Sequence, residues 1–371
     1  MSKKTYFITG GGTGGHIYPA VAVADELVKD GQNIYYVGNP KNLEFDIITQ
    51  KGYNFLPVDV HGMPRKLGGA LIVWGFQLLF AVIKSIFYIL KYKPDAVFGT
   101  GGYVSAPAMI AAKLLGKPYM MHDCDAQPGL VTRKLAPYAC AVSVAFESAN
   151  KFISNKNFYV NGNPIRPQFK TLSKEEARNA LGLNNKLTLC IMGGSQGART
   201  INDASVFLIK KLIKEYDIQI IFQTGKKNFA RVIEQILRTY PDYEADKNLI
   251  IKPFFDDMVT VLKASDIAVS RAGSLSLSEI EAAGLASILV PYPHAAADHQ
   301  RKNAKYMVEK GASLYLEDNE TDEKHLGELL EELIKNPDKL HSLQEGALKL
   351  AKYDGVNKIV EQLTSISHCD V

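Results

Sequence analysis

The feature that most constrains the fold of this chain is a unit of strand, glycine-rich loop and helix that occurs in both halves. In the first half, a β-type run at 5–9 leads into the loop 10–16, and an alanine-rich helical segment follows at 19–30. In the second half, an apolar run at 187–192 leads into the loop 193–198 and another helical segment. Such units build a parallel sheet with helices on both faces. The sequence therefore predicts two α/β domains with a ligand-binding cleft at the carboxyl ends of their strands.

Length and prolines set the expected domain boundary. The chain has 371 residues, more than one ordinary domain holds. Pro164 and Pro167 favour extended backbone and resist helix, which suits a linker. We predict an N-terminal Rossmann-like domain at 1–164 and a C-terminal one at 165–371, and leave open whether the last helix packs back on the N-terminal domain. Further strands are expected at 33–38, 95–99, 118–122, 218–224, 249–252, 267–270 and 287–291, with helices at 106–115 and within 321–366.

Composition argues against several classes of protein. Hydrophobic residues make up 46% and charged residues 22% of the chain, which is typical of a folded globular protein. With a net charge of +4 and no dense basic patch, the chain is not expected to bind nucleic acid. The 4 cysteines are scattered and form no C-x-x-C pair, which favours a reduced cytosolic compartment. No signal-peptide pattern is visible, so we expect the first domain to stay in the cytoplasm.

The first glycine loop has the spacing of a dinucleotide fingerprint, but its context argues against one. The fingerprint expects an acidic residue at the end of the second strand, where it binds a ribose. Here that strand ends at 37–40 without a carboxylate, which disfavours NAD or FAD. The loop is either a tight turn or a set of N–H groups that approach an anion at a helix N-terminus. His16 begins that helix and is a candidate functional residue. Similar loops at 101–103 and 193–197 favour a ligand with several phosphates.

Several polar residues follow predicted strands and are candidate ligand contacts. Glu279 lies early in a helix. Its carboxylate either binds a ribose diol or merely interacts favourably with the helix dipole. Gln300 either binds sugar hydroxyls or simply helps to begin the next helix. Asp123 and Asp125 resemble a D-x-D metal pair, but hard cations need more oxygen ligands than two residues offer. No metal site is therefore predicted.

The segment 71–90 is strongly apolar and about as long as a membrane span. It contains Gln77, Lys84 and Ser85 and lies between strands of one predicted sheet, which a span would divide. We favour a helix whose apolar face rests on the bilayer, and leave open a buried core helix or a span. The residues expected to touch the membrane are Trp74, Phe76, Leu79, Phe80 and Lys84. The basic residues expected to attract anionic headgroups are Arg65, Lys66, Lys84, Lys91 and Lys93.

Short motifs occur in a fixed order along nearly the whole chain. They are GGTGGHIYPA at 11–20, GGYVS at 101–105, GNPIR at 162–166, GGSQGA at 193–198, SRAG at 270–273 with SE at 278–279, and DHQ at 298–300 with NA at 303–304. Each motif alone is weak, but together they are very specific. The sequence resembles the family of bacterial UDP-N-acetylglucosamine transferases that convert lipid I to lipid II in peptidoglycan synthesis.

The resemblance implies the GT-B fold, in which two Rossmann-like domains face one another. The acceptor and the membrane would belong to 1–164, and the donor UDP-N-acetylglucosamine to 165–371. By position, the backbone of Phe255 would meet the uracil, Glu279 the ribose and Gln300 the N-acetylglucosamine. Ser195 and Arg166 would lie near the donor phosphates. The nucleotide would be lined by Ser274, Leu275, Ser276, Leu277 and Ser278. The reacting sugar and the acceptor diphosphate would be bordered by Thr13, Gly14, Gly15, Gly101, Gly102 and Tyr103.

One departure from the family pattern follows the strand at 118–122. The family usually has His-Glu-Gln-Asn where this chain has His122-Asp123-Cys124-Asp125. The family asparagine contacts the donor sugar. An ionised Asp125 accepts a hydrogen bond but cannot donate one, so this contact is in question.

The resemblance also implies an inverting transfer to the 4-hydroxyl of the muramyl sugar of undecaprenyl-pyrophosphate-linked lipid I. His16 is the first candidate base because an imidazole titrates near neutral pH, and Asp125 and His122 are alternatives. No cofactor is expected. The expected location is the cytoplasmic face of the bacterial cell membrane, as a peripheral protein, with other cell-wall synthesis proteins as candidate partners. Rival functions are another GT-B transferase, a sugar-nucleotide epimerase and a nonenzymatic nucleotide-sugar binding protein.

Overall fold

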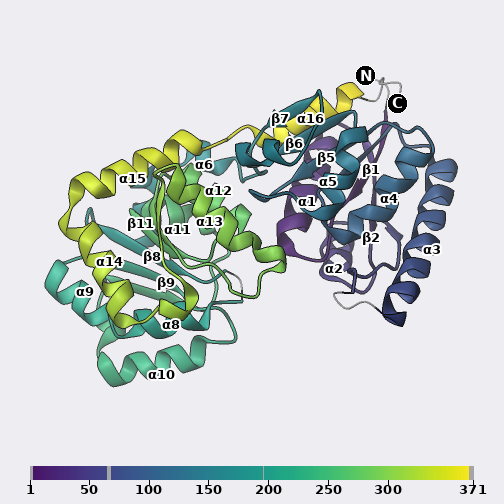
Figure 1. The fold of residues 1–371 in the computed structure, drawn as a ribbon. Coiled ribbons are helices and arrows are strands. Elements are labelled where there is room, and N and C mark those ends of the chain that lie inside the picture. The colour runs from purple at the N-terminus through teal and green to yellow at the C-terminus, as the bar shows by residue number, and fades with distance from the viewer. Residues whose placement is uncertain (1–2, 65–67, 195, 367–371) are drawn as a thin grey trace. The chain divides into compact units, whose positions relative to one another are not determined.

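The computed structural model describes residues 3–64, 68–194 and 196–366, and its contacts divide the chain into two compact units (Figure 1). The N-terminal unit comprises Met1–Ile165 and Asp354–Val371, and the C-terminal unit comprises Arg166–Tyr353. The C-terminal segment of the chain therefore returns to the N-terminal unit. Each unit is built on one parallel sheet.

The sheet of the N-terminal unit has seven strands in the order β3-β2-β1-β4-β5-β6-β7, all paired in parallel. The strand order reverses at β1, which pairs with β2 on one side and β4 on the other. Open α/β sheets bind ligands beside the carboxyl ends of the strands at such a reversal. The strands are β1 (Thr5–Thr9), β2 (Asn33–Gly38), β3 (Asn54–Pro57), β4 (Ala96–Gly99), β5 (Tyr119–Asp123), β6 (Ala141–Val144) and β7 (Phe158–Val160).

Alternate residues of β1 face two cores, because successive side chains of a strand point to opposite faces of the sheet. Tyr6 and Ile8 pack in one core with α1 (Gly14–Lys29) and α16 (Gly355–Ile366). Phe7 packs in the other core with α3 (Gly69–Tyr92) and α4 (Gly102–Leu114). The last helix thus packs on the N-terminal unit, where Ile359 and Leu363 are fully buried. This unit also contains two shorter α-helices, α2 (Leu43–Gln50) and α5 (Leu130–Leu135).

The sheet of the C-terminal unit has six parallel strands in the order β10-β9-β8-β11-β12-β13. The strands are β8 (Thr188–Met192), β9 (Gln219–Gln223), β10 (Leu249–Lys252), β11 (Ile267–Ser270), β12 (Ala286–Leu289) and β13 (Ser313–Tyr315). The helices are α6 (Gln168–Thr171), α7 (Lys174–Leu181), α8 (Arg199–Val206), α9 (Ile209–Tyr216), α10 (Phe229–Thr239), α11 (Met258–Ala264), α12 (Ser274–Ala283), α13 (His299–Glu309), α14 (Glu323–Lys335) and α15 (Pro337–Leu350).

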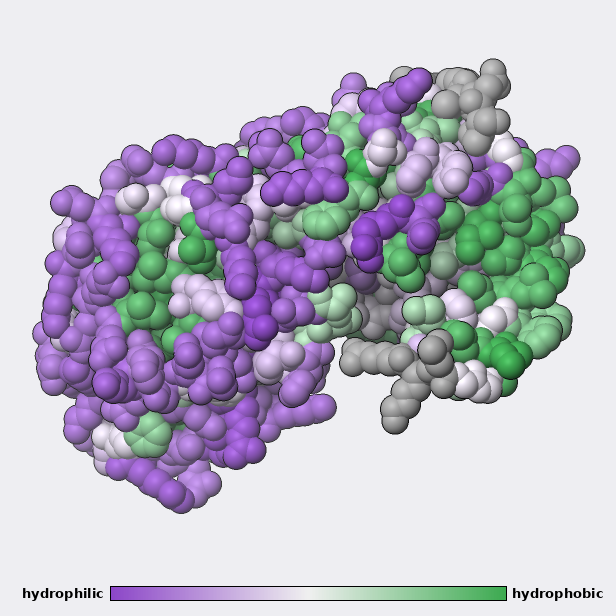
Figure 2. Space-filling view, viewed as in Figure 1, coloured by the Kyte–Doolittle hydropathy of each residue, from purple (hydrophilic) through white to green (hydrophobic). Residues whose placement is uncertain are grey.

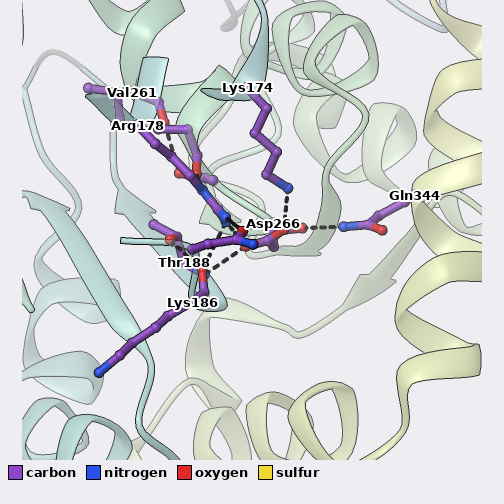
Figure 3. Close-up of polar contacts among 10 residues, drawn as sticks. Lys174, Arg178, Lys186, Thr188, Val261, Asp266 and Gln344 are labelled. Atoms are coloured by element: carbon purple, nitrogen blue, oxygen red, sulfur yellow. Dashed lines mark hydrogen bonds and ion pairs between the residues drawn. The ribbon is translucent and has the colours of Figure 1, made fainter. Parts of the chain in front are cut away.

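Asp266 ties three elements of the C-terminal unit together, namely α7, β8 and α15 (Figure 3). Its Oδ2 accepts from Nη2 of Arg178 on α7 at 2.8 Å and from the backbone N–H of Thr188 on β8 at 2.7 Å. Lys174 pairs with the other carboxylate oxygen, and the backbone carbonyl of Asp266 accepts from Gln344 on α15 at 3.1 Å. Asp266 precedes β11, whereas the candidate ligand residues follow the strands. This buried cluster therefore supports the scaffold at the sheet end away from those residues.

Candidate active site

His16 lies in the first turn of α1, directly after the glycine loop that follows β1. Its imidazole Nδ1 is 2.9 Å from the carbonyl oxygen of Thr100, and the Thr100 hydroxyl donates to the carbonyl of His16 at 2.6 Å. A carbonyl oxygen only accepts, so Nδ1 of a neutral ring carries the proton and Nε2 keeps its lone pair. The structure therefore holds His16 in the tautomer that a proton acceptor needs.

The loop at Gly101 and Gly102 packs against the imidazole. A Cβ on Gly102 would lie 2.9 Å from Cδ2 of His16 and 3.2 Å from the carbonyl oxygen of Gly11. Gly102 also has φ of +71°, which side chains disfavour. A Cβ on Gly101 would lie 3.7 Å from Cε1 of His16. These glycines thus make room for the histidine ring, a role the sequence did not reveal.

Cys124 links the end of β5 to the start of α1. Pro19 has no N–H, so the carbonyl of Gly15, four residues earlier, lacks its helical donor. The buried thiol of Cys124 donates to that carbonyl at 3.0 Å. Burial, followed by the nearby carboxylates, raises the pKa of this thiol and keeps it protonated. The sequence pattern gave no sign of this contact, which ties two parts of the site together.

The two carboxylates of the D-x-D pair have different surroundings. Asp123 is buried, and its oxygens accept from the backbone N–H groups of Asp125 at 3.2 Å and Gly129 at 3.1 Å. Burial, with the charge of Asp125 second, raises the pKa of the Asp123 carboxyl. Asp125 itself is half-buried. Among the described residues, no group of three or more His, Cys, Asp or Glu side chains could hold a metal ion.

The expectation that His122 is an alternative base needs correction. Its side chain is fully buried, and its ring nitrogens lie 2.9 Å from the hydroxyl of Ser143 and 3.3 Å from the amide oxygen of Asn163. Burial lowers the pKa of His122 to about 4, although the bond to Asn163 opposes the shift. A ring without solvent access cannot reach a substrate hydroxyl. His122 is therefore part of the support beneath the site.

We expect His122 to make the N-terminal unit less stable in acid. Its pKa is 6.5 when unfolded and about 4 when folded, so unfolding takes up a proton between these values. The free energy of unfolding should therefore fall as the pH drops below 6.5, by about 2 kcal/mol between pH 7 and pH 5. Urea unfolding followed by the fluorescence of the single tryptophan, Trp74, reports on this unit.

Two variants test this prediction through the pH dependence of their free energies of unfolding. His122→Gln should lose the slope between pH 7 and pH 5, because glutamine does not titrate. His341→Gln removes a histidine from the exposed surface of the other unit and should leave the slope unchanged. Equal slopes in wild type and His122→Gln would contradict the prediction.

Arg166 and Glu279, both expected to meet the donor, lie together in the C-terminal unit. Nη2 of Arg166 is 2.9 Å from Oε1 of Glu279 on α12. Burial raises the pKa of the Glu279 carboxyl, and the charge of Arg166 opposes the shift. The side chain of Arg166 is 39% exposed, whereas that of Glu279 is 15% exposed. The pair therefore has one face toward solvent, where a polar ligand could exchange partners with it.

Other expected donor residues already have internal partners. The backbone N–H of Phe255, which was expected to meet the uracil through its backbone, donates to Oε1 of Gln223 at 2.9 Å. Oε1 of Gln300 accepts from the backbone N–H of Tyr292 at 2.9 Å. Gln300 thus has its amide oxygen engaged, and its NH₂ group is the part suited to a sugar hydroxyl.

The stretch at 274–278 contributes less side-chain surface than we expected. Leu277 is fully buried, so it could line the nucleotide only through its backbone. Ser274 and Ser278 are buried as well, while Leu275 and Ser276 are half-buried. The reason is that α12 turns one face into the core, and a five-residue run on a helix cannot face one ligand throughout.

The glycine loop between β8 and α8 also depends on close backbone contacts. A Cβ on Gly193 would lie 2.1 Å from the backbone nitrogen of Ala198, and one on Gly197 would lie 2.1 Å from the carbonyl oxygen of Thr224. The chain therefore needs glycine at both positions. Ser195, the expected phosphate contact, lies outside the described residues.

The apolar segment forms the helix α3. By length and composition alone, this helix is long enough and apolar enough to cross a membrane. Its buried residues all lie in its second half, namely Ala81, Val82, Ser85, Tyr88 and Ile89. Figure 2 shows hydrophobic side chains gathered over this helix. Of the expected membrane contacts, Trp74 is half-buried and donates to the carbonyl of His61 at 2.9 Å. The others are exposed, namely Phe76, Leu79, Phe80 and Lys84. Arg65 and Lys66 lie outside the described residues.

The chain matches known proteins over both units. Residues 6–144 match the glycosyltransferase family 28 N-terminal domain, and residues 188–360 match the glycosyltransferase family 28 C-terminal domain. A protein of Desulforamulus reducens named UDP-N-acetylglucosamine–N-acetylmuramyl-(pentapeptide) pyrophosphoryl-undecaprenol N-acetylglucosamine transferase is 36% identical over 97% of this chain and 98% of its own length. A protein of Caldanaerobacter subterraneus with the same name is 37% identical, over 98% of this chain and 100% of its own. The chain belongs to this transferase family.

A solved member of the family has the same architecture. The crystal structure of Acinetobacter baumannii MurG matches with a TM-score of 0.79 and 27% identity, over 98% of this chain and 99% of that chain. The transferase family, and with it the GT-B fold, was predicted from the ordered motifs and is confirmed. The candidate ligand residues of this chain lie near the carboxyl ends of strands, with one set in each unit.

Proposed function

We propose that this chain transfers N-acetylglucosamine from UDP-N-acetylglucosamine to lipid I, the undecaprenyl-pyrophosphate-linked N-acetylmuramyl pentapeptide, and so forms lipid II. The observation that carries the proposal is the match, over both units, to transferases named for this reaction. The N-terminal unit takes the acceptor and the membrane. The C-terminal unit takes the donor.

The chemistry in this proposal is an inverting displacement with His16 as the base. The 4-hydroxyl oxygen of the muramyl sugar bonds to the anomeric carbon of the donor as the bond from that carbon to UDP breaks. The hydroxyl proton passes to Nε2 of His16, which the Thr100 contact leaves unprotonated. Asp125, half-buried on the loop after β5, is the remaining alternative base. Arg166 and the N–H groups of the glycine loops would stabilise the departing diphosphate.

A test with labelled UDP-N-acetylglucosamine and a lipid I analogue separates the rival functions. Labelled product that carries both sugars supports the proposal. Conversion of the donor to UDP-N-acetylmannosamine would indicate an epimerase. Donor binding without turnover would indicate a nucleotide-sugar binding protein, and transfer to other aglycones alone would indicate another GT-B transferase.

Removal of Glu279 is expected to weaken donor binding. If its carboxylate accepts the ribose hydroxyls, Glu279→Ala loses charge-assisted hydrogen bonds and the Kd for UDP should rise about 10- to 100-fold. Titration calorimetry with UDP measures this directly. Glu234→Ala, which removes an exposed carboxylate from the same unit, should leave the Kd unchanged. An unaltered Kd in Glu279→Ala would argue against ribose binding by this residue.

We also propose that the exposed face of α3 rests on the cytoplasmic leaflet, as a peripheral contact that brings the site to its lipid-linked acceptor. The alternative that α3 is a buried core helix is unsupported, because only 17% of its apolar 18-residue window is buried. A span would remove Tyr88 and Ile89 from the core that they share with Phe7, and would divide the sheet, because α3 connects β3 to β4. Lys84 and Lys91 are exposed at the packed end of the helix, where they can attract anionic headgroups.

Vesicle binding tests the membrane proposal. Phe76 is 59% and Phe80 68% exposed, so Phe76→Ser with Phe80→Ser should leave the fold intact. Their removal should weaken binding to vesicles that contain anionic lipid by at least about 10-fold, because each buried aromatic ring contributes about 1.5–3 kcal/mol. Leu237→Ser on α10, 47% exposed, is the matched control. Sedimentation of the double variant with vesicles at wild-type levels would exclude this face.

A further inference from the structure

A buried carboxylate lies directly beneath the glycine loop of the N-terminal unit. Glu44, in the first turn of α2, has no exposed surface. Its Oε2 accepts from the backbone N–H of Gly12 at 3.2 Å. Its Oε1 accepts from the backbone N–H of Asn39 and from Nδ2 of Asn42, both at 3.2 Å. All three partners are N–H donors, and no ion pair to Glu44 occurs within the described part of the chain.

The carboxylate explains why the loop needs glycine. A Cβ on Gly11 would lie 2.5 Å from Cδ of Glu44, so any side chain at this position would displace the carboxylate. The sequence suggested that N–H groups of this loop hold a ligand anion. In the structure, the N–H of Gly12 holds an anion that belongs to the protein itself. The N–H of Gly12 is therefore not available to a substrate phosphate.

The same carboxylate connects both glycine loops of the N-terminal unit. Nδ2 of Asn42 donates to Glu44 and also to the hydroxyl of Tyr103 at 3.1 Å. The ring of Tyr103 covers the loop from the other side, since a Cβ on Gly12 would lie 2.9 Å from its Cε1. The loop before His16 is thus fixed between Glu44 and Tyr103. A shift of this loop would move the imidazole that follows it.

We infer that Glu44 is a positioning residue for the transfer: it acts as a built-in anion that fixes the loop 10–12 and thereby places His16 against the acceptor. The same charge disfavours a phosphate at the N–H of Gly12. This agrees with the placement of the acceptor diphosphate near Gly14 and Gly15 that the family resemblance implies. This inference rests on the proposed function. It adds a residue and a constraint on the acceptor that the motifs do not contain.

Glu44→Gln tests the inference without creating a cavity. The amide has the size of the carboxylate, but it offers one oxygen and one NH₂ group to three N–H donors. At least one N–H donor would therefore face another donor and lose its hydrogen bond. We expect kcat to fall about 10- to 100-fold through misplacement of His16. The Kd for UDP should stay within about two-fold of wild type, because the donor residues lie in the other unit. Asp46→Asn, which removes an exposed carboxylate from the same turn of α2, is the matched control and should keep wild-type kcat.

A second readout needs no substrate. Hydrogen exchange followed by mass spectrometry should be faster in a peptide that spans 10–17 of Glu44→Gln, and unchanged in a peptide that spans β5. If wild type makes no lipid II, the proposed function fails, whereas the exchange comparison still decides the role of Glu44. A variant with wild-type kcat, or with wild-type exchange in the loop, would overturn the inference. If Glu44→Gln does not fold, Asn42→Ala removes one of the three donors and should give a smaller change in the same direction.

Discussion

Replacement of His16 by alanine is expected to lower turnover by about 10²- to 10⁴-fold, the usual contribution of a general base. The reason is structural as well as chemical. The Thr100 carbonyl accepts a hydrogen bond from Nδ1–H, so Nε2 is the one ring atom that can accept the hydroxyl proton of the acceptor. Steady-state transfer of labelled N-acetylglucosamine measures the loss, and calorimetry with UDP should show that the donor still binds.

His16→Asn separates base chemistry from loop organisation. The asparagine NH₂ group can occupy the place of Nδ1 and still donate to Thr100, but nothing replaces Nε2. If His16 is the base, His16→Asn should be as impaired as His16→Ala. Near-normal turnover in either variant would exclude His16 as the base and leave Asp125 as the alternative. His325→Ala removes an exposed histidine from α14 and should have no effect.

Gly102→Ala is expected to lower turnover by about 10²-fold, although Gly102 has no side chain that could take part in the reaction. The added Cβ would lie 2.9 Å from the His16 ring and 3.2 Å from the carbonyl oxygen of Gly11. The ring must therefore move, and a shift of about 1 Å at a catalytic group costs on the order of 10²-fold. Transfer kinetics measure the loss.

The control for this prediction is Gly116→Ala. Gly116 has φ of +60°, close to the +71° of Gly102, so both variants carry a similar backbone cost of about 1–2 kcal/mol. A Cβ on Gly116 would meet no atom within 4 Å, so nothing in the site moves. Equal losses in the two variants would show that backbone strain, not contact with His16, is responsible. In a His16→Ala background, Gly102→Ala should add little, because the two changes act through one ring.

Much of the fold follows from short-range patterns in the sequence. β1, β2, β10 and β11 were predicted with their observed ends, because an apolar run bounded by turn residues is a local signal. The helices α1 and α4 begin at Gly14 and Gly102, four or five residues before the predicted starts. Glycine and proline weaken an isolated helix, but here contacts with neighbouring loops hold these first turns in place.

Elements with weak local signals were not predicted. The strands β3, β7 and β13 have three or four residues each, and α2, which carries Glu44, has eight. Such short segments are stable only through their neighbours in the sheet. Thr100 was missed for a similar reason, since its carbonyl and its hydroxyl contact His16, 84 residues away in sequence, which no local pattern marks.

The opening units of strand, glycine loop and helix determined the architecture without help from tertiary structure. Hydrophobic periodicity and glycine punctuation act over a few residues, and they specified two parallel sheets and the strand ends where ligands bind. The ordered motifs determined the family. Only the tertiary structure decided what the glycines are for, because their partners lie far away in sequence. Gly12 donates to Glu44, Gly102 makes room for His16, and Gly15 accepts from Cys124. A glycine in the sequence indicates that space is needed, but not which group fills that space. Only the packing of distant segments shows which group this is.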